Sequence, residues 1–181
     1  ESVIIRMFRN ECDRVFSDRL TTEFDQDVWS RELATVLKQT FPASAGDANI
    51  NPCMFGDFKH AVERVVDGST EDIPLYQDMG NFEQVRTIFD GVLDQYNLEN
   101  KAMRLVLFEQ ALEHLCRVHR IIRNVRGNAL LVGVGGSGKQ SLSVLASYCA
   151  GYKIFTITLS RGYGEVQFKE ELKELYKMLG Q

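Results

Sequence analysis

The sequence is poor in cysteine and proline and contains no long hydrophobic run. Its 181 residues include four cysteines, three prolines and a single tryptophan. The cysteines lie far apart, with no Cys-x-x-Cys pair or Cys/His cluster, which argues against a zinc site and a disulfide framework. No stretch approaches the roughly 20 apolar residues of a membrane-spanning helix. We therefore expect a globular, cytoplasmic protein with reduced thiols, no membrane partner, and Cys116 and Cys149 as core residues.

The N-terminus has neither an initiator methionine nor a signal peptide, so Glu1 is interpreted as the boundary of an excerpt. Charge is distributed unevenly along the chain. Residues 1–97 carry 9 Lys/Arg against 18 Asp/Glu, whereas residues 98–181 carry 12 against 7. This asymmetry predicts two structural units. No basic-aromatic array accompanies the positive excess, so we expect no nucleic-acid partner.

A glycine-rich loop is the most informative motif. The segment Gly133-Val134-Gly135-Gly136-Ser137-Gly138-Lys139 fits the phosphate-binding pattern G-x-x-x-x-G-K. Glycines permit positive φ, so that backbone amides can converge on an anion, and the N-terminus of the following helix adds further amides. Lys139 would reach the terminal phosphates. The motif predicts a nucleoside triphosphate; the alternative is a glycine-rich linker without a ligand.

The residue after Lys139 departs from the pattern. A Ser or Thr is expected there, because its hydroxyl binds Mg²⁺, but the sequence has Gln140. The amide oxygen of Gln140 would reach Mg²⁺ only over a longer arm, and Ser141 lies about 100° further around the helix. Gln140 is therefore a weak Mg²⁺ candidate, and hydrolysis does not follow from the motif.

The segments around the loop predict an α/β unit. Apolar and β-branched runs predict two strands, and amphipathic spacing predicts two helices; the expected order is strand 128–132, helix 140–150, strand 153–159 and helix 165–179. An ATPase also needs an acidic residue at the end of a further strand. No such strand lies between Lys139 and Gln181, so we predict an incomplete catalytic site and assign no catalytic residue.

The first half of the chain predicts helices separated by turn-rich loops. Helical spacing covers residues 3–20, 28–40 with Asp27 as cap, part of 55–67, and 82–96 with Asn81 as cap, and the loops are 43–53 and 68–74. Apolar periodicity also allows one long helix over residues 101–123.

Several segments resemble dynein heavy chains. The stretch Leu105–Ala111 and the stretch Gly127–Leu142, with its unusual Gly-Lys-Gln-Ser, are similar to the fourth AAA+ module of an axonemal-type motor ring. Residues 157–159, 161–163 and 168–169 agree with that module. Residues 11–20 resemble the helical lid of the third module. The resemblance covers nearly the whole chain and is most specific over residues 96–169.

The resemblance implies a two-module layout. Residues 1–96 would be the helical small subdomain of the third module, and residues 97–181 the first part of the P-loop α/β large subdomain of the fourth. The loop before the first helix would pack on adenine, so that helix would begin nearer Glu109. The implied nucleotide-binding residues are Gly133, Val134, Gly135, Gly136, Ser137, Gly138, Lys139, Gln140, Ser141, Val106 and Leu107. Arg6, Arg9, Arg14 and Arg19 are alternatives for a sensor arginine, or ordinary surface ion-pair residues.

The function implied by the resemblance is that of a motor fragment with a regulatory ATP or ADP site. Such a motor would move along microtubules in cilia, within the axonemal cytoskeleton, and its partners would be the other modules, microtubules, and intermediate and light chains. Two alternatives stay open from the residues. One is a stand-alone P-loop NTPase or kinase whose acidic strand lies elsewhere, and the other is a structural module whose loop binds nothing.

Overall fold

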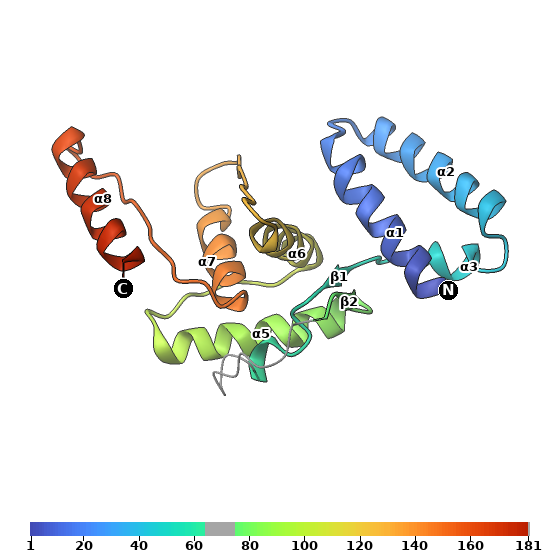
Figure 1. The fold of residues 1–181 in the computed structure, drawn as a ribbon, viewed down its shortest axis with the longest axis horizontal. Helices are drawn as coiled ribbons and strands as arrows, with labels where there is room; N and C mark the ends of the chain where they lie inside the picture. The colour runs from blue at the N-terminus through green and yellow to red at the C-terminus, as the bar shows by residue number, and fades with distance from the viewer. Residues whose placement is uncertain (64–74, 181) are drawn as a thin grey trace.

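The computed structural model describes residues 1–63 and 75–180 and is mostly helical (Figure 1). The elements follow one another as α1 Ser2–Val15, the 3₁₀ turn η1 Ser17–Arg19, α2 Glu23–Thr40, α3 Ala45–Ala48, β1 Phe55–Gly56, β2 Gln77–Asp78, α5 Phe82–Glu99, α6 Glu109–Arg123, α7 Lys139–Cys149 and α8 Glu165–Leu179. The predicted loop 68–74 lies outside the described residues, and so do Val65 and Val66 of the segment 55–67, part of which was predicted to be helical.

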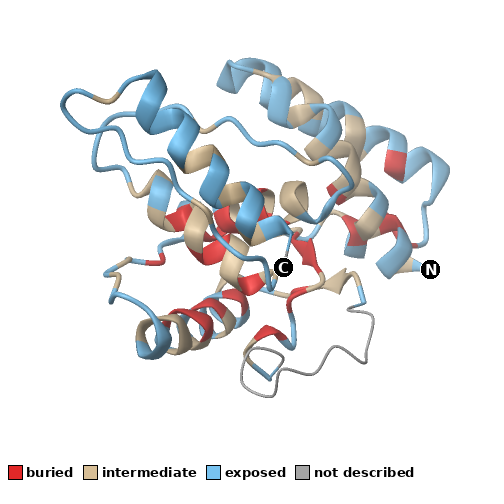
Figure 2. Ribbon diagram, turned by 60° about the vertical axis from the view of Figure 1, so that its left-hand side comes forward, coloured by how far each residue is buried: buried red, intermediate tan, exposed pale blue. Residues whose placement is uncertain are grey.

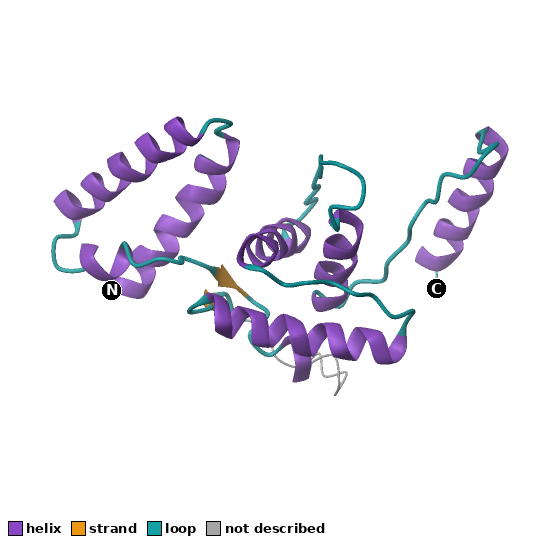
Figure 3. Ribbon diagram, turned by 180° about the vertical axis from the view of Figure 1, so that it is seen from behind, coloured by secondary structure: helices purple, strands orange, loops and turns teal. Residues whose placement is uncertain are grey.

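Helices α1 and α2 form a hairpin at one end of the molecule (Figures 1 and 3). Trp29 joins them, because its ring lies 5.3 Å from that of Phe16 and its indole N–H donates to Asp13 at 2.8 Å. The predicted cap of α2, Asp27, is wrong. Thr22 caps the helix instead, since its hydroxyl oxygen accepts from the Asp25 amide at 3.1 Å and satisfies a first-turn amide. The helix ends at Phe41 as predicted.

The predicted 43–53 loop contains a short helix, α3, which packs between α1 and α2. Strand β1 then pairs with β2 in antiparallel register, with Phe55 opposite Asp78 and Gly56 opposite Gln77. This two-strand ribbon connects the α1–α2 hairpin to the central helices.

The main core lies where α5, α6 and α7 meet (Figure 2). Helix α5 begins at the predicted cap: the Asn81 side chain accepts from the Gln84 amide, and Gln84 reaches back to the Asn81 amide. The fully buried side chains of this core include Phe58, Val85, Phe89, Val92, Leu112, Leu115 and Leu145. Cys116 and Cys149 are buried in the same core, as predicted. The core extends across residue 97, and the two-module division stays a prediction.

The two predicted strands of the α/β unit are not formed. Residues 128–132 and 153–159 form neither helix nor strand, and Figure 3 draws both as loops. Leu130 and Val132 are 90% and 86% exposed rather than buried. A parallel strand is stable only between hydrogen-bonded neighbours, and within residues 1–63 and 75–180 the one sheet is the β1–β2 ribbon. The helical part of the expected fold class is therefore confirmed, and the sheet is not.

Helix α8 has the predicted bounds but packs on no core. It stands apart from α7 in Figures 1 and 3, and none of its described residues is buried. Phe168 and Leu179, two apolar residues of its amphipathic pattern, are exposed. The amphipathic pattern predicted the helix correctly, because that pattern depends on local spacing rather than on a partner.

Candidate nucleotide-binding site

The glycine-rich loop turns sharply into α7. Gly136 and Gly138 have φ values of +78° and +77°, in the region that side-chain-bearing residues rarely adopt. Gly138 is the N-cap of α7, and its carbonyl accepts the first helical hydrogen bond, from the Leu142 amide at 2.8 Å. The loop thus has the conformation that the motif predicts.

The start of α7 presents backbone donors to solvent. No side chain caps Gly138, and the amides of residues 139–141 precede the first intrahelical bond. Among the described residues, none of these three amides donates to a protein acceptor. Together with the positive end of the helix dipole, they form a set of donors suited to an anion. The residues present therefore fit the phosphate groups of a nucleotide.

The Lys139 ammonium lies against the loop. It donates to the carbonyl oxygens of Gly133 and Val134 at 2.8 and 2.6 Å and to the Ser137 hydroxyl at 2.9 Å. A Cβ atom on Gly133 would lie 3.4 Å from this nitrogen, within ordinary van der Waals contact. The cation is held beside the free amides, where it can add its charge to their field.

A pocket of about 560 Å³ opens beside the loop. The loop and the start of α7 form its polar side, and the segment before α6 contributes apolar side chains together with Arg104. Its lining residues are Arg104, Leu105, Val106, Phe108, Gly136, Ser137, Gly138, Lys139, Gln140 and Ser141. An apolar wall facing a phosphate cradle across one pocket is an arrangement that can hold a base and its phosphates together.

The apolar wall is formed by extended chain. Helix α6 begins at Glu109, so the long helix predicted by periodicity from Lys101 is wrong, and the start implied by the family resemblance is confirmed. Extended residues alternate between two sides. Val106 and Phe108 are exposed at the pocket, whereas Leu107 is 6% exposed and belongs to the core.

The structure brings together most of the predicted site residues. Six residues from Gly136 to Ser141 and Val106 line one pocket, and Gly133, Val134 and Gly135 form the adjoining part of the loop. Leu107 points into the core instead. The sequence analysis did not assign Arg104 or Phe108, although Phe108 could have been found by continuing the alternation from Val106 in an extended strand.

Two candidate features of other kinds find no support in the described part of the chain. No group of three or more His, Cys, Asp or Glu residues is arranged there to hold a metal ion. None of the described helices has the length and apolar character needed to cross a membrane.

Of the alternative sensor arginines, Arg6, Arg9 and Arg14 form ion pairs with Asp78, Asp13 and Asp18.

Comparison with known proteins gives one consistent result. Residues 103–181 match the family described as the P-loop-containing dynein motor region D4. Over 97% of its length the chain is 48% identical to the dynein-1-alpha heavy chain of the flagellar inner arm I1 complex of Chlamydomonas reinhardtii. Over 98% it is 46% identical to human dynein axonemal heavy chain 10 and 41% identical to the dynein beta chain of the flagellar outer arm of C. reinhardtii. The chain spans only 4% of the length of each of these relatives.

Proposed function

The chain belongs to the dynein heavy-chain family, and on this premise we propose that it supplies a regulatory nucleotide site to a dynein-type motor ring. Residues 1–96 would be the helical subdomain that ends the third AAA+ module, and residues 97–181 would begin the fourth. The match of residues 103–181 to the D4 region supports the second assignment.

The observation that supports the nucleotide assignment is a pocket with hydrogen-bond donors on one side and apolar side chains on the other. Free amides and the Lys139 ammonium are on one side, and Val106 and Phe108 are exposed on the other. Phosphates need the first wall and a purine base needs the second. We assign ATP or ADP as the ligand, with adenine against the wall before α6.

Gln140 makes this site suited to binding more than to hydrolysis. Mg²⁺, when bound with the nucleotide, supplies positive charge at the terminal phosphates. The Gln140 side chain is at the pocket but replaces the hydroxyl that usually binds this ion, and Ser141 is half-buried one position later. The residues of this chain therefore bind and orient phosphates, and we assign none of them a catalytic role.

A binding site of this kind can regulate a ring by shifting its conformational populations. The nucleotide would favour the arrangement to which it binds more tightly, by an amount equal to its differential affinity. The relatives are named as axonemal and flagellar arm proteins. We accordingly place this chain in a microtubule motor of the ciliary axoneme, with the remaining modules, microtubules, and intermediate and light chains as partners.

The alternative of a stand-alone P-loop kinase or NTPase is disfavoured. The similarity to heavy chains covers 97–98% of the chain in the three relatives named above, and so includes the helices before the P-loop region. The second alternative is a structural module whose loop binds nothing. A count of bound nucleotides distinguishes it from the proposed function.

The test is to count the nucleotides bound to the intact heavy chain after gentle purification, by mass spectrometry. Lys139→Ala should reduce the count by one per chain, because it removes the cation at the phosphate side. Lys38→Ala, on the exposed end of α2, is the matched control and should leave the count unchanged. An equal count in Lys139→Ala and wild type would refute the nucleotide assignment.

A further inference from the structure

The apolar wall of the pocket is tied at both ends to helix α5. At one end the Arg86 guanidinium Nε donates to the Leu107 carbonyl oxygen at 2.9 Å. At the other end the Asn97 amide forms two bonds with the Met103 backbone: its oxygen accepts from the Met103 N–H at 2.7 Å, and its nitrogen donates to the Met103 carbonyl at 3.2 Å. These three bonds fix the backbone on both sides of Val106.

These hydrogen bonds hold the backbone of residues 103–107 and do not involve the side chains that line the pocket. Leu107 is buried in the core below the wall, and Leu105 packs against the same core. With the backbone held from α5 and these two side chains held by the core, Val106 and Phe108 remain exposed at the pocket. The position of the wall is therefore set by α5, a helix that does not itself line the pocket.

Helix α5 also contacts the helix that carries the phosphate loop. The Tyr148 hydroxyl of α7 donates to the Glu99 carboxylate at 2.6 Å, and the Tyr148 ring meets the Tyr96 ring edge-on at 5.2 Å. The same helix thus contacts the element behind each side of the pocket. Helix α5 therefore bridges the base wall and the helix that carries the phosphate loop.

We propose that Arg86 and Asn97 are positioning residues that hold the base-binding wall at residues 103–108, and that α5 thereby sets the nucleotide affinity of the pocket. This inference rests on the proposed nucleotide-binding function. It assigns a role to two side chains that do not touch the ligand and that act only on the base side of the pocket.

The split between base and phosphate gives the proposal a specific test. ATP uses both walls, whereas inorganic tripolyphosphate uses only the loop, Lys139 and the free amides. Loss of one or two positioning hydrogen bonds should weaken ATP binding about three- to tenfold. Tripolyphosphate binding should not change, because no bond of Arg86 or Asn97 reaches the loop.

The experiment measures the binding of ATP and of tripolyphosphate to the intact heavy chain, as wild type, Arg86→Ala and Asn97→Ala. Binding to this pocket is taken as the part of the total binding that is lost in Lys139→Ala. Arg86→Lys should recover part of the ATP affinity, since a lysine can still donate one bond. Arg31→Ala is the matched control: Arg31 also donates to a backbone carbonyl, that of Asp27, but within α2 and away from the pocket. ATP affinity equal to wild type in Arg86→Ala and Asn97→Ala, or equal losses for ATP and tripolyphosphate, would overturn the proposal.

Hydrogen exchange separates failure of this inference from failure of the nucleotide assignment. Without any nucleotide, Arg86→Ala and Asn97→Ala should increase exchange at residues 103–108 relative to Arg31→Ala. If Lys139→Ala removes no ATP binding, the proposed function fails, and faster exchange at 103–108 still supports the tie. Unchanged exchange in both variants would refute the tie itself, whatever the result for the nucleotide.

Discussion

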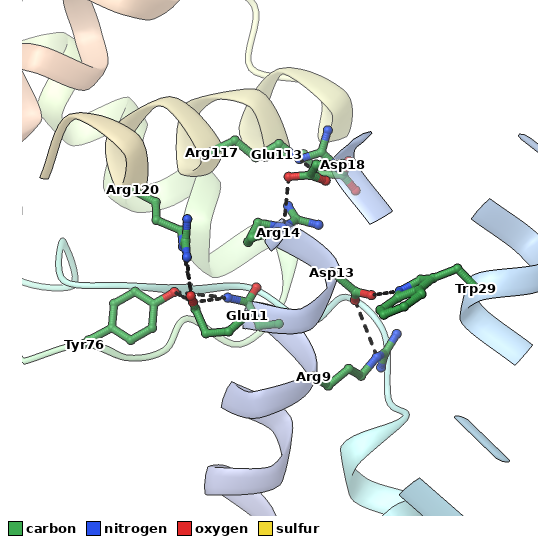
Figure 4. A network of polar contacts seen from close by, with 11 residues as sticks. Arg9, Glu11, Asp13, Arg14, Asp18, Trp29, Tyr76, Glu113, Arg117 and Arg120 are labelled. Carbon is green, nitrogen blue, oxygen red and sulfur yellow. Dashed lines mark hydrogen bonds and ion pairs between the residues drawn. The ribbon is translucent and has the colours of Figure 1, made fainter. Parts of the chain in front are cut away.

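Glu11 and Arg120 lie 109 positions apart in the sequence and form a hydrogen-bonded ion pair between α1 and α6 (Figure 4). The Glu11 Oε1 atom, to which Arg120 Nε donates, also accepts from the Tyr76 hydroxyl at 2.6 Å and from the Asn10 side-chain amide at 3.1 Å. Helix α6 follows directly after the base wall of the pocket. The Glu11 carboxylate is thus one point at which the N-terminal hairpin is joined to α6, a second being the Asp18–Arg117 ion pair at 3.6 Å.

Replacing Glu11 should loosen this joint. Glu11→Gln keeps the shape of the side chain but removes the charge that Arg120 pairs with. Because the pair is partly exposed, we expect a loss of about 1 kcal/mol in the free energy of local opening at α1 and α6. Hydrogen exchange of the intact chain measures this quantity. Glu32→Gln, an exposed residue of α2, is the control; equal exchange in the two variants would show that the ion pair contributes nothing.

The joint should also depend on pH. Burial alone would raise the pKa of Glu11, but hydrogen bonds from Arg120 and Tyr76 outweigh it, so the pKa lies below its ordinary value of 4.5. A carboxylate with a lowered pKa in the folded state stabilises that state above its ordinary pKa, and the contribution is lost as pH falls through the lowered value.

Exchange at α1, corrected for the intrinsic effect of pH, should therefore show less protection as pH is lowered from about 5 to about 3. The decrease should be smaller in Glu11→Gln, which has no carboxyl group to titrate there. Parallel curves for wild type and variant would assign the pH dependence to other groups.

Gly138→Ala should distort the phosphate cradle. A residue with a Cβ at φ +77° costs about 1–2 kcal/mol, so nucleotide affinity should fall about tenfold. Gly135→Ala is the comparison within the same loop, because Gly135 does not have positive φ and an added Cβ would meet nothing within 4 Å. Its loss should be clearly smaller in the same binding assay, and equal losses would contradict the assigned loop conformation.

Gln140→Thr should make nucleotide binding more dependent on Mg²⁺. The variant restores a hydroxyl at the position where the motif expects one. We expect the ratio of ATP affinities with Mg²⁺ and with a chelator to rise about fivefold, which corresponds to ~1 kcal/mol. Gln140→Leu removes the amide without adding a hydroxyl and should not raise the ratio. A ratio equal to wild type in Gln140→Thr would refute the explanation based on the missing hydroxyl.

The features that were predicted correctly from the sequence depend on local chemistry. The Asn81 cap of α5, the positive-φ turn at Gly138 and the end of α2 at Phe41 are all specified by neighbouring residues. The motif likewise located the residues that form one side of the pocket, because its glycines and lysine lie within one loop.

The features that were missed depend on distant partners. Periodicity could not show that α6 begins at Glu109, because the apolar residues before it are held by α5 and the core rather than by helical turns. No local signal marks Arg86, whose acceptor lies 21 positions further along the chain. The strands predicted at 128–132 and 153–159 are not formed, although their composition favours extended chain, because a strand also needs a neighbour to pair with.

The most direct test of the nucleotide site is photo-crosslinking of an azido-adenine analogue of ATP to the intact heavy chain, followed by peptide mapping. We expect a label within residues 104–108, because Val106 and Phe108 form the wall assigned to adenine. Lys139→Ala should abolish this label and Lys38→Ala should retain it. Absence of label from residues 104–108 in wild type, or full labelling in Lys139→Ala, would contradict a nucleotide site in this pocket.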